Sequence, residues 1–533
     1  MDVSSLSALL RSSPFLLLLL ALLVPIFSSL FLFSARKKLS PSCADGGQRL
    51  PPSPPGFPVL GHLPLLGSLP HRKLRSLAEA HGPVMLLHLG RVPTVVASSA
   101  AAAQEAMKTR DLAFASRAQI RMAERLLYGR DMVLAPYGEY WRQARRVCVV
   151  HLLNHRRILS FRRVREQEVA ALLDGVRRRS LHPPGVLNLS DMLTSYSNAV
   201  IKRAAFGDGE YGIDGDDGGE KLRKVLDDFE ELLGTPTVGE FVPWLAWVDT
   251  LTGLNARATR TFEALDGLLE RVIADHRKRR LAGGPVVGDG LDDQRDFVDV
   301  LLDVSETGEE AGGVRFDVVS IKAIMLDMFA AATDTTYTTM EWTMAELINH
   351  PRVMQKLQDE IRAAVNGAGH VTEDHLGTLR YLRAVIRETL RLHAPLPLLL
   401  PRETLEDTEL LGYRVPARTR VVINAWAIGR DPATWERAEE FVPERFVDDP
   451  AEYGAGHDDF RAVPFGAGRR GCPGVGFAVP SMELALAGLL YHFDWEPPLA
   501  AGGAASKLDL SELFGISVRL KTALHVVAKP WSP

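Results

Sequence analysis

The chain has 533 residues, of which 46% are apolar and 24% are charged, as in ordinary globular proteins. Its formal net charge of −4 gives no reason to expect a nucleic-acid partner. Its three cysteines, Cys43, Cys148 and Cys472, are too few and too scattered for a disulfide framework, so a reducing compartment is expected.

The N-terminal region contains an apolar segment long enough to cross a membrane. Residues 15–33 carry no charge, and as a helix they would span roughly 28 Å, close to the hydrocarbon thickness of a bilayer. Basic residues at 36–38 follow the segment and only Arg11 precedes it, which predicts a cytosolic C-terminal side. A cleaved signal peptide is the alternative, but its basic residues would precede the apolar run. We expect a short lumenal N-terminus (1–14) and a single-pass transmembrane signal anchor (15–34).

A proline-rich stretch follows the predicted anchor. It reads Leu50-Pro51-Pro52-Ser53-Pro54-Pro55-Gly56-Phe57-Pro58. Such a composition favours an extended polyproline conformation and a semi-rigid spacer. Residues 35–58 are therefore predicted to form a basic, proline-rich hinge between the membrane and a globular body.

Residues 59–533 are predicted to form one large domain, because no linker divides them and no internal repeat is visible. Short apolar runs predict strands, and apolar residues spaced three or four apart predict helices. The predicted strands are 85–90, 94–97 and 419–424, with others near the C-terminus. The clearest predicted helices are 164–179, 257–281 and 318–349. The expected fold class is mainly α with small β-sheets (α+β).

Trp141 and Arg145 lie four residues apart in a cationic helical stretch, so both side chains occupy one face of the helix. An indole N–H and a guanidinium are good hydrogen-bond donors to carboxylates. Because most cationic helix faces are simply solvated, this pair predicts an anion site only together with other evidence.

An acid beside hydroxyl groups interrupts the predicted helix 318–349. The sequence there is Ala331-Ala332-Thr333-Asp334-Thr335-Thr336. Asp and Thr are weak helix formers because their side chains compete for backbone hydrogen bonds. A stretch that breaks local rules inside a long apolar helix is a candidate functional site.

Glu388 and Arg391 lie three residues apart on one helical face, where they can pair. Most such pairs are exposed and contribute little to stability. Here apolar residues flank the pair, and a further arginine, Arg445, follows in Pro443-Glu444-Arg445-Phe446. These three residues are predicted to have a structural role, as a buried ionic cluster that specifies geometry.

A glycine-rich loop holds the most informative cysteine of the chain. It reads Phe465-Gly466-Ala467-Gly468-Arg469-Arg470-Gly471-Cys472-Pro473-Gly474 and leads into an apolar helical pattern. The glycines permit close approach of the backbone, and Arg470 with the amides of the following helix favours a thiolate at Cys472. The loop suits a thiolate that faces a large, flat, anionic cofactor. The alternative is a buried structural cysteine.

The pattern Phe-x-x-Gly-x-Arg-x-Cys-x-Gly of this loop resembles the haem-binding signature of the cytochrome P450 family. The Ala-Ala-Thr-Asp-Thr-Thr stretch is similar to the oxygen-binding motif of that family, and the Glu388–Arg391 pair with Arg445 resembles its Glu-x-x-Arg motif and partner arginine. One departure is Ala332, which stands where the family usually has glycine and is expected to narrow the oxygen site or to change coupling. The resemblance extends over nearly the whole chain and is greatest to plant A-type, microsomal members.

The resemblance implies the P450 fold and a role for each motif residue. Cys472 would be the axial iron ligand, and Thr335 and Asp334 would be catalytic, contacting dioxygen and relaying protons to it. The residues that would bind the cofactor, four of them through its propionates, are Trp141, Arg145, Arg402, Phe465 and Arg470.

The implied function is a membrane-anchored haem-thiolate monooxygenase of plant specialised metabolism or xenobiotic detoxification. The implied cofactor is haem b, with O2 as cosubstrate and NADPH as an indirect electron source. Because no dinucleotide-binding Gly-x-Gly-x-x-Gly is apparent, electrons should come from NADPH–cytochrome P450 reductase, docked near Arg469 and Arg470, with cytochrome b5 as a further partner. The implied location is the endoplasmic reticulum membrane, with the catalytic domain in the cytosol.

Two other functions stay open. Some family members are isomerases or dehydratases that need no reductase, but those that rearrange hydroperoxides tend to lack the acid–alcohol pair present at Asp334 and Thr335. A catalytically silent haem-binding partner protein would have no need of proton-relay residues.

The substrate is expected to be a hydrophobic or aromatic small molecule. By the resemblance, the segments that line the substrate pocket are 118–133, 325–333, 394–400 and 514–517. The apolar residues named within them are Met325, Phe329, Leu396, Leu398, Leu399 and Ile516. Apolar pockets discriminate weakly by shape, so several substrates fit this expectation.

Overall fold

The computed structural model describes residues 49–181, 185–209, 218–283, 293–307, 316–449, 453, 459–498 and 507–532. The predicted N-terminus (1–14), the anchor (15–34) and the first part of the hinge lie outside the described residues.

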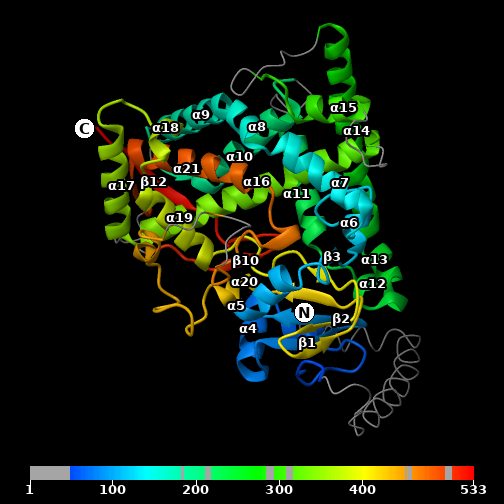
Figure 1. The fold of residues 1–533 in the computed structure, drawn as a ribbon. Coiled ribbons are helices and arrows are strands. Elements are labelled where there is room, and N and C mark those ends of the chain that lie inside the picture. Colours follow the sequence, from blue (N-terminus) through cyan, green and yellow to red (C-terminus); the bar gives the residue numbers. More distant parts are fainter. Residues whose placement is uncertain are drawn as a thin grey trace, which may run out of the picture.

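Helices form most of the described chain (Figure 1). The α-helices are α3 Leu63–Leu66, α4 Pro70–His81, α5 Ala100–Gln104, α6 Arg121–Leu126, α7 Glu139–Val147, α8 His155–Ser160, α9 Arg162–Ser180, α10 Leu189–Phe206, α11 Gly218–Gly234, α12 Val238–Phe241, α13 Trp247–Leu251, α14 Leu254–Leu281, α15 Phe297–Thr307, α16 Val318–Asn349, α17 Pro351–Val365, α18 Glu373–Leu376, α19 Arg380–Leu392, α20 Ala425–Ile428 and α21 Val475–His492. Short turns of other helix types are η1 Glu105–Thr109, η2 Cys148–Leu152, η3 Pro243–Leu245, η5 Pro443–Phe446 and η6 Gly468–Arg470.

The strands form small sheets. They are β1 Val84–Leu89, β2 Val92–Ala97, β3 Ser116–Arg117, β4 Val186–Asn188, β5 Arg402–Glu403, β6 Thr408–Leu410, β7 Tyr413–Val415, β8 Arg420–Ile423, β9 Phe493–Glu496, β10 Glu512–Phe514, β11 Val518–Leu520 and β12 His525–Pro530. The largest sheet has the order β1-β2-β8-β5-β3, in which β2 and β8 run parallel with Thr94 opposite Arg420. Smaller sheets are β4-β12-β9, β10-β11 and β6-β7. The predicted strands 85–90, 94–97 and 419–424 correspond to β1, β2 and β8.

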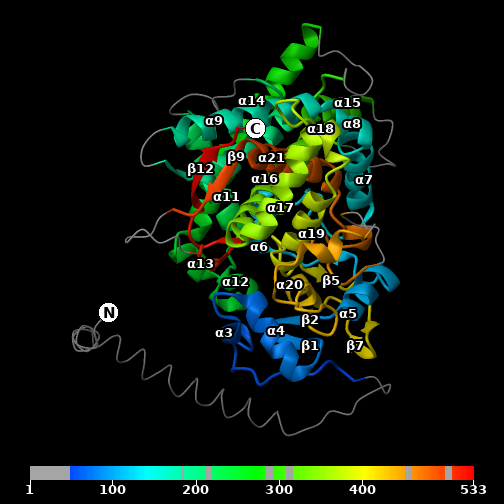
Figure 2. The ribbon, with the colours of Figure 1, turned by 90° about the vertical axis from the view of Figure 1, so that its left-hand side faces the viewer.

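The five-stranded sheet lies at one end of the molecule, and the helices pack at the other (Figures 1 and 2). Helix α16 runs through the middle of the helical part and is buried along most of its length. It begins at a capping residue, Asp317, whose side chain accepts a hydrogen bond from Ser320 N at 2.9 Å. It ends before Pro351, which starts α17.

Aromatic contacts fix the neighbours of α16. The rings of Phe206 on α10 and Phe329 on α16 are stacked, with centroids 5.7 Å apart. The buried Trp342 of α16 donates from Nε1 to Val518 O on β11 at 2.9 Å. The predicted helix 318–349 therefore forms with the bounds that the sequence indicated, and its position at the centre comes from these contacts.

Helix α21 follows the cysteine loop and lies beside α9, α16 and α17 in the core. Among the described residues, α21 is the one helix that is long and apolar enough to cross a membrane. However, 67% of this helix is buried inside the protein. Its apolar surface is therefore already used in the core.

The proline-rich stretch is attached to the body. Leu86 N of β1 donates to Pro52 O at 2.9 Å, and His62 Nε2 is 2.8 Å from Pro54 O. Pro51 and Pro54 are buried. The described part of the predicted hinge is thus held against the sheet, which fixes the direction in which the chain leaves the body.

Candidate active site

The cysteine loop owes its shape to glycine. Gly468 has φ of +67°, and a Cβ built there would lie 2.0 Å from Met107 O on η1. Any other residue at this position would be strained and would collide with backbone. The loop closes through Cys472 N, which donates to Phe465 O at 2.9 Å, and it ends at Gly474, the residue before α21.

Cys472 lies deep in the protein, yet its side chain is exposed to an internal cavity. Burial raises the pKa of its thiol, and the backbone amide of Gly474, the charge of Arg145 and the amide of Val475 act in the opposite direction. Stable deprotonation therefore requires a cationic partner at the sulfur, which a metal ion supplies.

The cavity lies between the cysteine loop and α16. Its volume is about 280 Å³. Ala331 is exposed in the middle of the otherwise buried α16, and Ala332 and Thr335 are partly exposed, because these three residues form one wall of the cavity. Ala332, which departs from the family's usual glycine, thus adds a methyl group to this wall.

The Thr335 hydroxyl points back along its own helix. It donates to Ala331 O at 2.7 Å, a local bond that satisfies the hydroxyl hydrogen. Thr333 and Thr339 make the same type of bond to Phe329 O at 3.0 Å and to Thr335 O at 2.8 Å. The oxygen of Thr335 keeps acceptor capacity toward the cavity.

Asp334 is buried beside Thr335 and belongs to a polar network. Its carboxyl is hydrogen-bonded by Ser517 and Tyr337 and lies near Arg519, whose Nη1 is 3.4 Å from the Tyr337 hydroxyl. Burial raises the pKa of Asp334, and these partners oppose the shift. The raised pKa makes Asp334 a candidate for proton transfer in the cavity.

A second acid, Glu230 on α11, lines the same cavity. Burial, followed by the charges of Asp334 and Asp227, raises the pKa of Glu230 to about 9. The sequence did not single out this residue, because its amphipathic helix looks like any other surface helix. Only the approach of α11 to α16 reveals it.

Four arginines meet at one end of the cavity: Arg117, Arg145, Arg402 and Arg470. Each donates to backbone carbonyls: Arg117 to Leu400 O at 2.6 Å, Arg145 to Gly471 O at 2.7 Å, Arg402 to Ala467 O at 3.0 Å, and Arg470 to Ala115 O at 2.7 Å. None of them forms an ion pair with a carboxylate of the described residues. We call these residues the arginine cluster.

The arginine cluster is electrostatically unbalanced. Burial lowers the pKa of Arg402 to about 10, and burial with repulsion from Arg402 lowers the pKa of Arg470 to about 9. Burial and the charges of Arg402 and Arg470 also lower the pKa of Arg117. Nη1 of Arg470 is buried without a hydrogen-bond partner. The cluster therefore has the character of an anion site that lacks its anion.

Trp141 reaches this cluster with its ring rather than with its N–H group. The indole Nε1 donates to Met132 O at 3.0 Å, and the Cζ atom of Arg470 lies 4.0 Å from the ring centroid. The expected role of Trp141 as a hydrogen-bond donor to the cofactor would require it to give up the bond to Met132. That role stays a prediction.

Glu388, Arg391 and Arg445 are brought together behind the cysteine loop. Glu388 is bound in bidentate fashion by Arg391, at 2.7 and 2.8 Å, and by Arg445 Nε at 3.1 Å. Its Oε1 also accepts from Val442 N at 2.8 Å. Arg391 in turn donates to Gly429 O at 2.6 Å. Both Glu388 and Arg391 are fully buried, so each charge depends on this network.

The predicted substrate-pocket residues divide into two groups. Leu396, Leu399 and Ile516 line the cavity. The other three lie in the core instead: Met325 is buried, Phe329 stacks on Phe206, and Leu398 packs with Leu74 and its neighbours. A helix has several faces, and the sequence could not tell which face of 325–333 would meet the cavity.

Arg117 was also absent from the predicted set. It lies on the two-residue strand β3 directly after the buried residues Phe114 and Ala115. A lone arginine in an apolar segment is the signal that could have indicated it, since buried charges are rarely left unpaired.

The family model described as Cytochrome P450 matches residues 51–504. The chain belongs to the cytochrome P450 family. This P450 is 44% identical to norfluorocurarine oxidase from Strychnos over 97% of its own length and 98% of the relative. It is 47% identical to cytochrome P450 71A1 of Persea americana, covering 88% of this chain and 91% of that one. It is 43% identical to (+)-menthofuran synthase of Mentha piperita, covering 96% and 99%.

The fold agrees with solved P450 structures. A zebrafish cytochrome P450 with abiraterone superposes with a TM-score of 0.72 at 25% identity, covering 87% of this chain and 100% of that one. The predicted plant A-type P450 with a mainly helical fold is therefore confirmed, and so is the prediction of a haem-thiolate monooxygenase. Like its family, this P450 uses haem b and O2 and receives electrons from NADPH through a reductase.

The residues of the cavity fit haem b. Of the described cysteines, Cys472 faces the cavity. No arginine of the cluster is ion-paired within the described residues, and the carboxylate of the buried Asp131 only partly offsets their charge. The two propionates of a haem would supply the missing anionic charge, and an iron ion would stabilise the thiolate.

Proposed function

We propose that this P450 is anchored in the endoplasmic reticulum membrane, with its catalytic domain in the cytosol, and inserts one oxygen atom of O2 into a hydrophobic or aromatic small molecule. The observation that carries the proposal is the cavity itself, with Cys472 on one side, Thr335 and Asp334 on α16 on the other, and the arginine cluster at one end. The predicted division into residues 1–14, 15–34, 35–58 and 59–533 belongs to this proposal.

In the proposed site, the Cys472 thiolate would bind the haem iron, and Arg145, Arg402 and Arg470 would bind the propionates together with Arg117. Phe465, the first residue of the cysteine loop, lines the same cavity and would pack against the cofactor. When bound, the haem supplies the iron at which O2 is reduced, with electron density donated by the thiolate.

The proton path is built from this chain's own residues. Burial raises the pKa of Asp334 within its polar network. Glu230 lies on the same cavity with a pKa of about 9, so Glu230 is protonated at neutral pH. Thr335 lines the same cavity. We assign Asp334 and Glu230 as proton donors and Thr335 as the group that orients the acceptor through its hydroxyl.

The substrate class follows from the cavity wall. Apolar side chains such as Leu127, Leu396 and Ile516 surround the space next to Ala331 and Thr335. These side chains exclude water, so a substrate binds to them through apolar contacts more than through hydrogen bonds. Relatives named norfluorocurarine oxidase and (+)-menthofuran synthase support a role in specialised metabolism or detoxification.

The proposed electron donor is the NADPH–cytochrome P450 reductase of the same membrane, with cytochrome b5 as a further partner. The expected docking residue Arg470 is buried in the arginine cluster, so it is not available at the surface. Arg469 is half exposed and pairs with Asp111 at 3.2 Å. Arg146 on the adjacent α7 is exposed. The proposed docking surface therefore comprises Arg146 and Arg469.

The absorption spectrum of the full-length protein, reduced and exposed to carbon monoxide, tests the proposal. Thiolate ligation gives a strongly red-shifted Soret band, which Cys472→His should replace with a histidine-type band. Haem bound without that shift in the wild type would overturn the assignment of Cys472. Arg146→Ala with Arg469→Ala should lower reductase-supported turnover and leave peroxide-supported turnover unchanged; equal losses would exclude the docking surface.

A further inference from the structure

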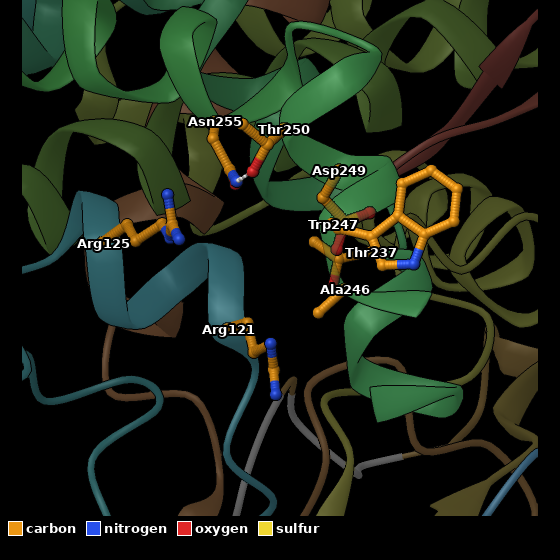
Figure 3. Close-up of a pocket in the computed structure, with 8 residues that line it drawn as sticks. All are labelled: Arg121, Arg125, Thr237, Ala246, Trp247, Asp249, Thr250 and Asn255. Atoms are coloured by element: carbon orange, nitrogen blue, oxygen red, sulfur yellow. Dashed lines mark hydrogen bonds between the residues drawn. The ribbon is translucent and has the colours of Figure 1, made fainter. Parts of the chain in front are cut away.

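A second pocket lies on the outer surface between α6 and the segment α12–α14 (Figure 3). Its volume is about 270 Å³, and no role in haem binding or oxygen chemistry requires it. The residues that line it are Arg121, Arg125, Thr237, Ala246, Trp247, Asp249, Thr250 and Asn255. We call it the outer pocket.

Two arginines on α6 supply positive charge to the outer pocket. Arg121 and Arg125 are four residues apart on α6, and both side chains line the pocket, in different directions (Figure 3). Within the described residues, neither guanidinium has an ion-pair or hydrogen-bond partner. Two exposed guanidiniums that share one pocket and no carboxylate partner are a suitable arrangement for binding a phosphate oxygen pair.

A buried hydroxyl faces the same pocket without a partner. Thr237 is only 4% exposed, and its Oγ1 makes no hydrogen bond. It precedes α12, where a threonine usually accepts a hydrogen bond from a helix amide. Here Asp249 replaces it, because Oδ1 and Oδ2 accept from Val238 N at 2.8 Å and from Gly239 N at 2.9 Å. The Thr237 hydroxyl is thereby left free for a ligand.

The charge of the outer pocket matches a phosphodiester. Arg121 and Arg125 contribute two positive charges, and Asp249 contributes one negative charge that is already bound by two amides. The Arg121 guanidinium and the Asp249 carboxylate both lie against Gly239. The resulting single positive charge balances the single negative charge of a phosphodiester group.

The segment 243–251 gives one side of the pocket an exposed apolar rim. Trp247, which lines the pocket, is 57% exposed, and Trp244 and Leu251 of the same segment are 52% and 75% exposed. Tryptophans of this kind favour the boundary between water and lipid. A free phosphate ion would gain nothing from such a rim, whereas acyl chains would bury it. We infer that the outer pocket binds the phosphate of a membrane phospholipid, with its chains along Trp247 and Leu251.

The inference is tested by calorimetric titration of the full-length protein in a nonionic detergent. The probe is dihexanoyl phosphatidylglycerol below its micelle concentration, compared with dihexanoylglycerol and with inorganic phosphate. Arg121→Gln combined with Arg125→Gln should weaken binding of the probe about tenfold or more, because both phosphate contacts are lost. Arg178→Gln with Arg352→Gln, two exposed arginines on α9 and α17, is the matched control and should not change it.

Thr237→Val is a second, nearly isosteric variant. It removes a hydroxyl that has no partner, so it should not lower the melting temperature while it weakens binding about threefold or more. Unchanged affinity in the double arginine variant would overturn the inference, as would equal binding of dihexanoylglycerol. Inorganic phosphate that binds as tightly as the probe would overturn the assignment to a lipid. None of these outcomes depends on haem, so the carbon monoxide spectrum tests the proposed function separately.

Discussion

Glu230 of α11 and Asp334 of α16 line the same cavity, and the charge of Asp334 adds to burial in raising the pKa of Glu230 to about 9. Two acids from helices far apart in the sequence thus lie on one cavity with Thr335, and each influences the protonation of the other. Because the two acids interact, their titration belongs to the pair rather than to either residue alone.

Glu230→Gln should make the stability of the protein less dependent on pH. Between its ordinary pKa of 4.5 and about 9, folded Glu230 keeps a proton that the unfolded chain releases, so raising the pH lowers the free energy of unfolding. Glutamine cannot titrate and removes this contribution. Melting temperatures across that pH window measure it, with the exposed Glu436→Gln as control; identical slopes in both variants would contradict the prediction.

Gly468→Ala should destabilise the cysteine loop, because the added Cβ would lie 2.0 Å from Met107 O and φ is +67°. The expected cost is on the order of 2 kcal/mol, with a lower haem content after purification. Gly474→Ala is the matched control, since its Cβ would lie 3.8 Å from Cys472 Sγ, an ordinary contact. Equal losses of haem in the two variants would argue against backbone collision as the cause.

Thr335→Ala should uncouple electron consumption from product formation. The substitution removes the Thr335 hydroxyl from the cavity wall, while the bond from this hydroxyl to Ala331 O is dispensable to the helix. Product formed per NADPH should fall by about tenfold or more. Thr343→Ala is the control, because Thr343 makes the same type of bond, to Thr339 O at 2.8 Å, but is buried away from the cavity. A similar loss in both would point to the helix rather than to the hydroxyl.

Glu388→Ala should destabilise the protein by about 3–5 kcal/mol, because it leaves the fully buried Arg391 without its carboxylate. Arg445→Ala should cost less, since Arg445 is 12% exposed and its bond to Glu388 is longer, at 3.1 Å. Urea unfolding followed by circular dichroism gives the comparison. The reverse order of the two losses would show that Arg391 does not depend on Glu388.

Arg117→Gln should stabilise the haem-free protein and weaken the binding of haem. It relieves repulsion within the arginine cluster, which favours the haem-free fold, and removes a contact to a propionate, which disfavours the bound state. Haem transfer to apomyoglobin should become about tenfold faster or more. The melting temperature of the haem-free protein should not fall; a fall in both forms would indicate a purely structural arginine.

The local motifs of this chain could be predicted from the sequence, but their surroundings could not. The bounds of α16 and the cysteine loop follow from spacing and glycine placement within a few residues. Arg117 and Glu230 come from segments that carry no motif, and only tertiary packing brings them to the cavity. The direction of the Trp141 N–H and the burial of Arg470 depend on the carbonyls of Met132 and Ala115, which no periodicity reveals.

The cysteine loop is supported by contacts within the protein: Cys472 N donates to Phe465 O, Gly468 packs against Met107, and Arg145 donates to Gly471 O. Because these contacts use only protein atoms, we expect the loop to keep its form around a different metalloporphyrin. Reconstitution with synthetic porphyrins carrying cobalt or manganese should therefore proceed without refolding. Such metal-exchanged enzymes would make this scaffold a starting point for group-transfer chemistry other than oxygenation.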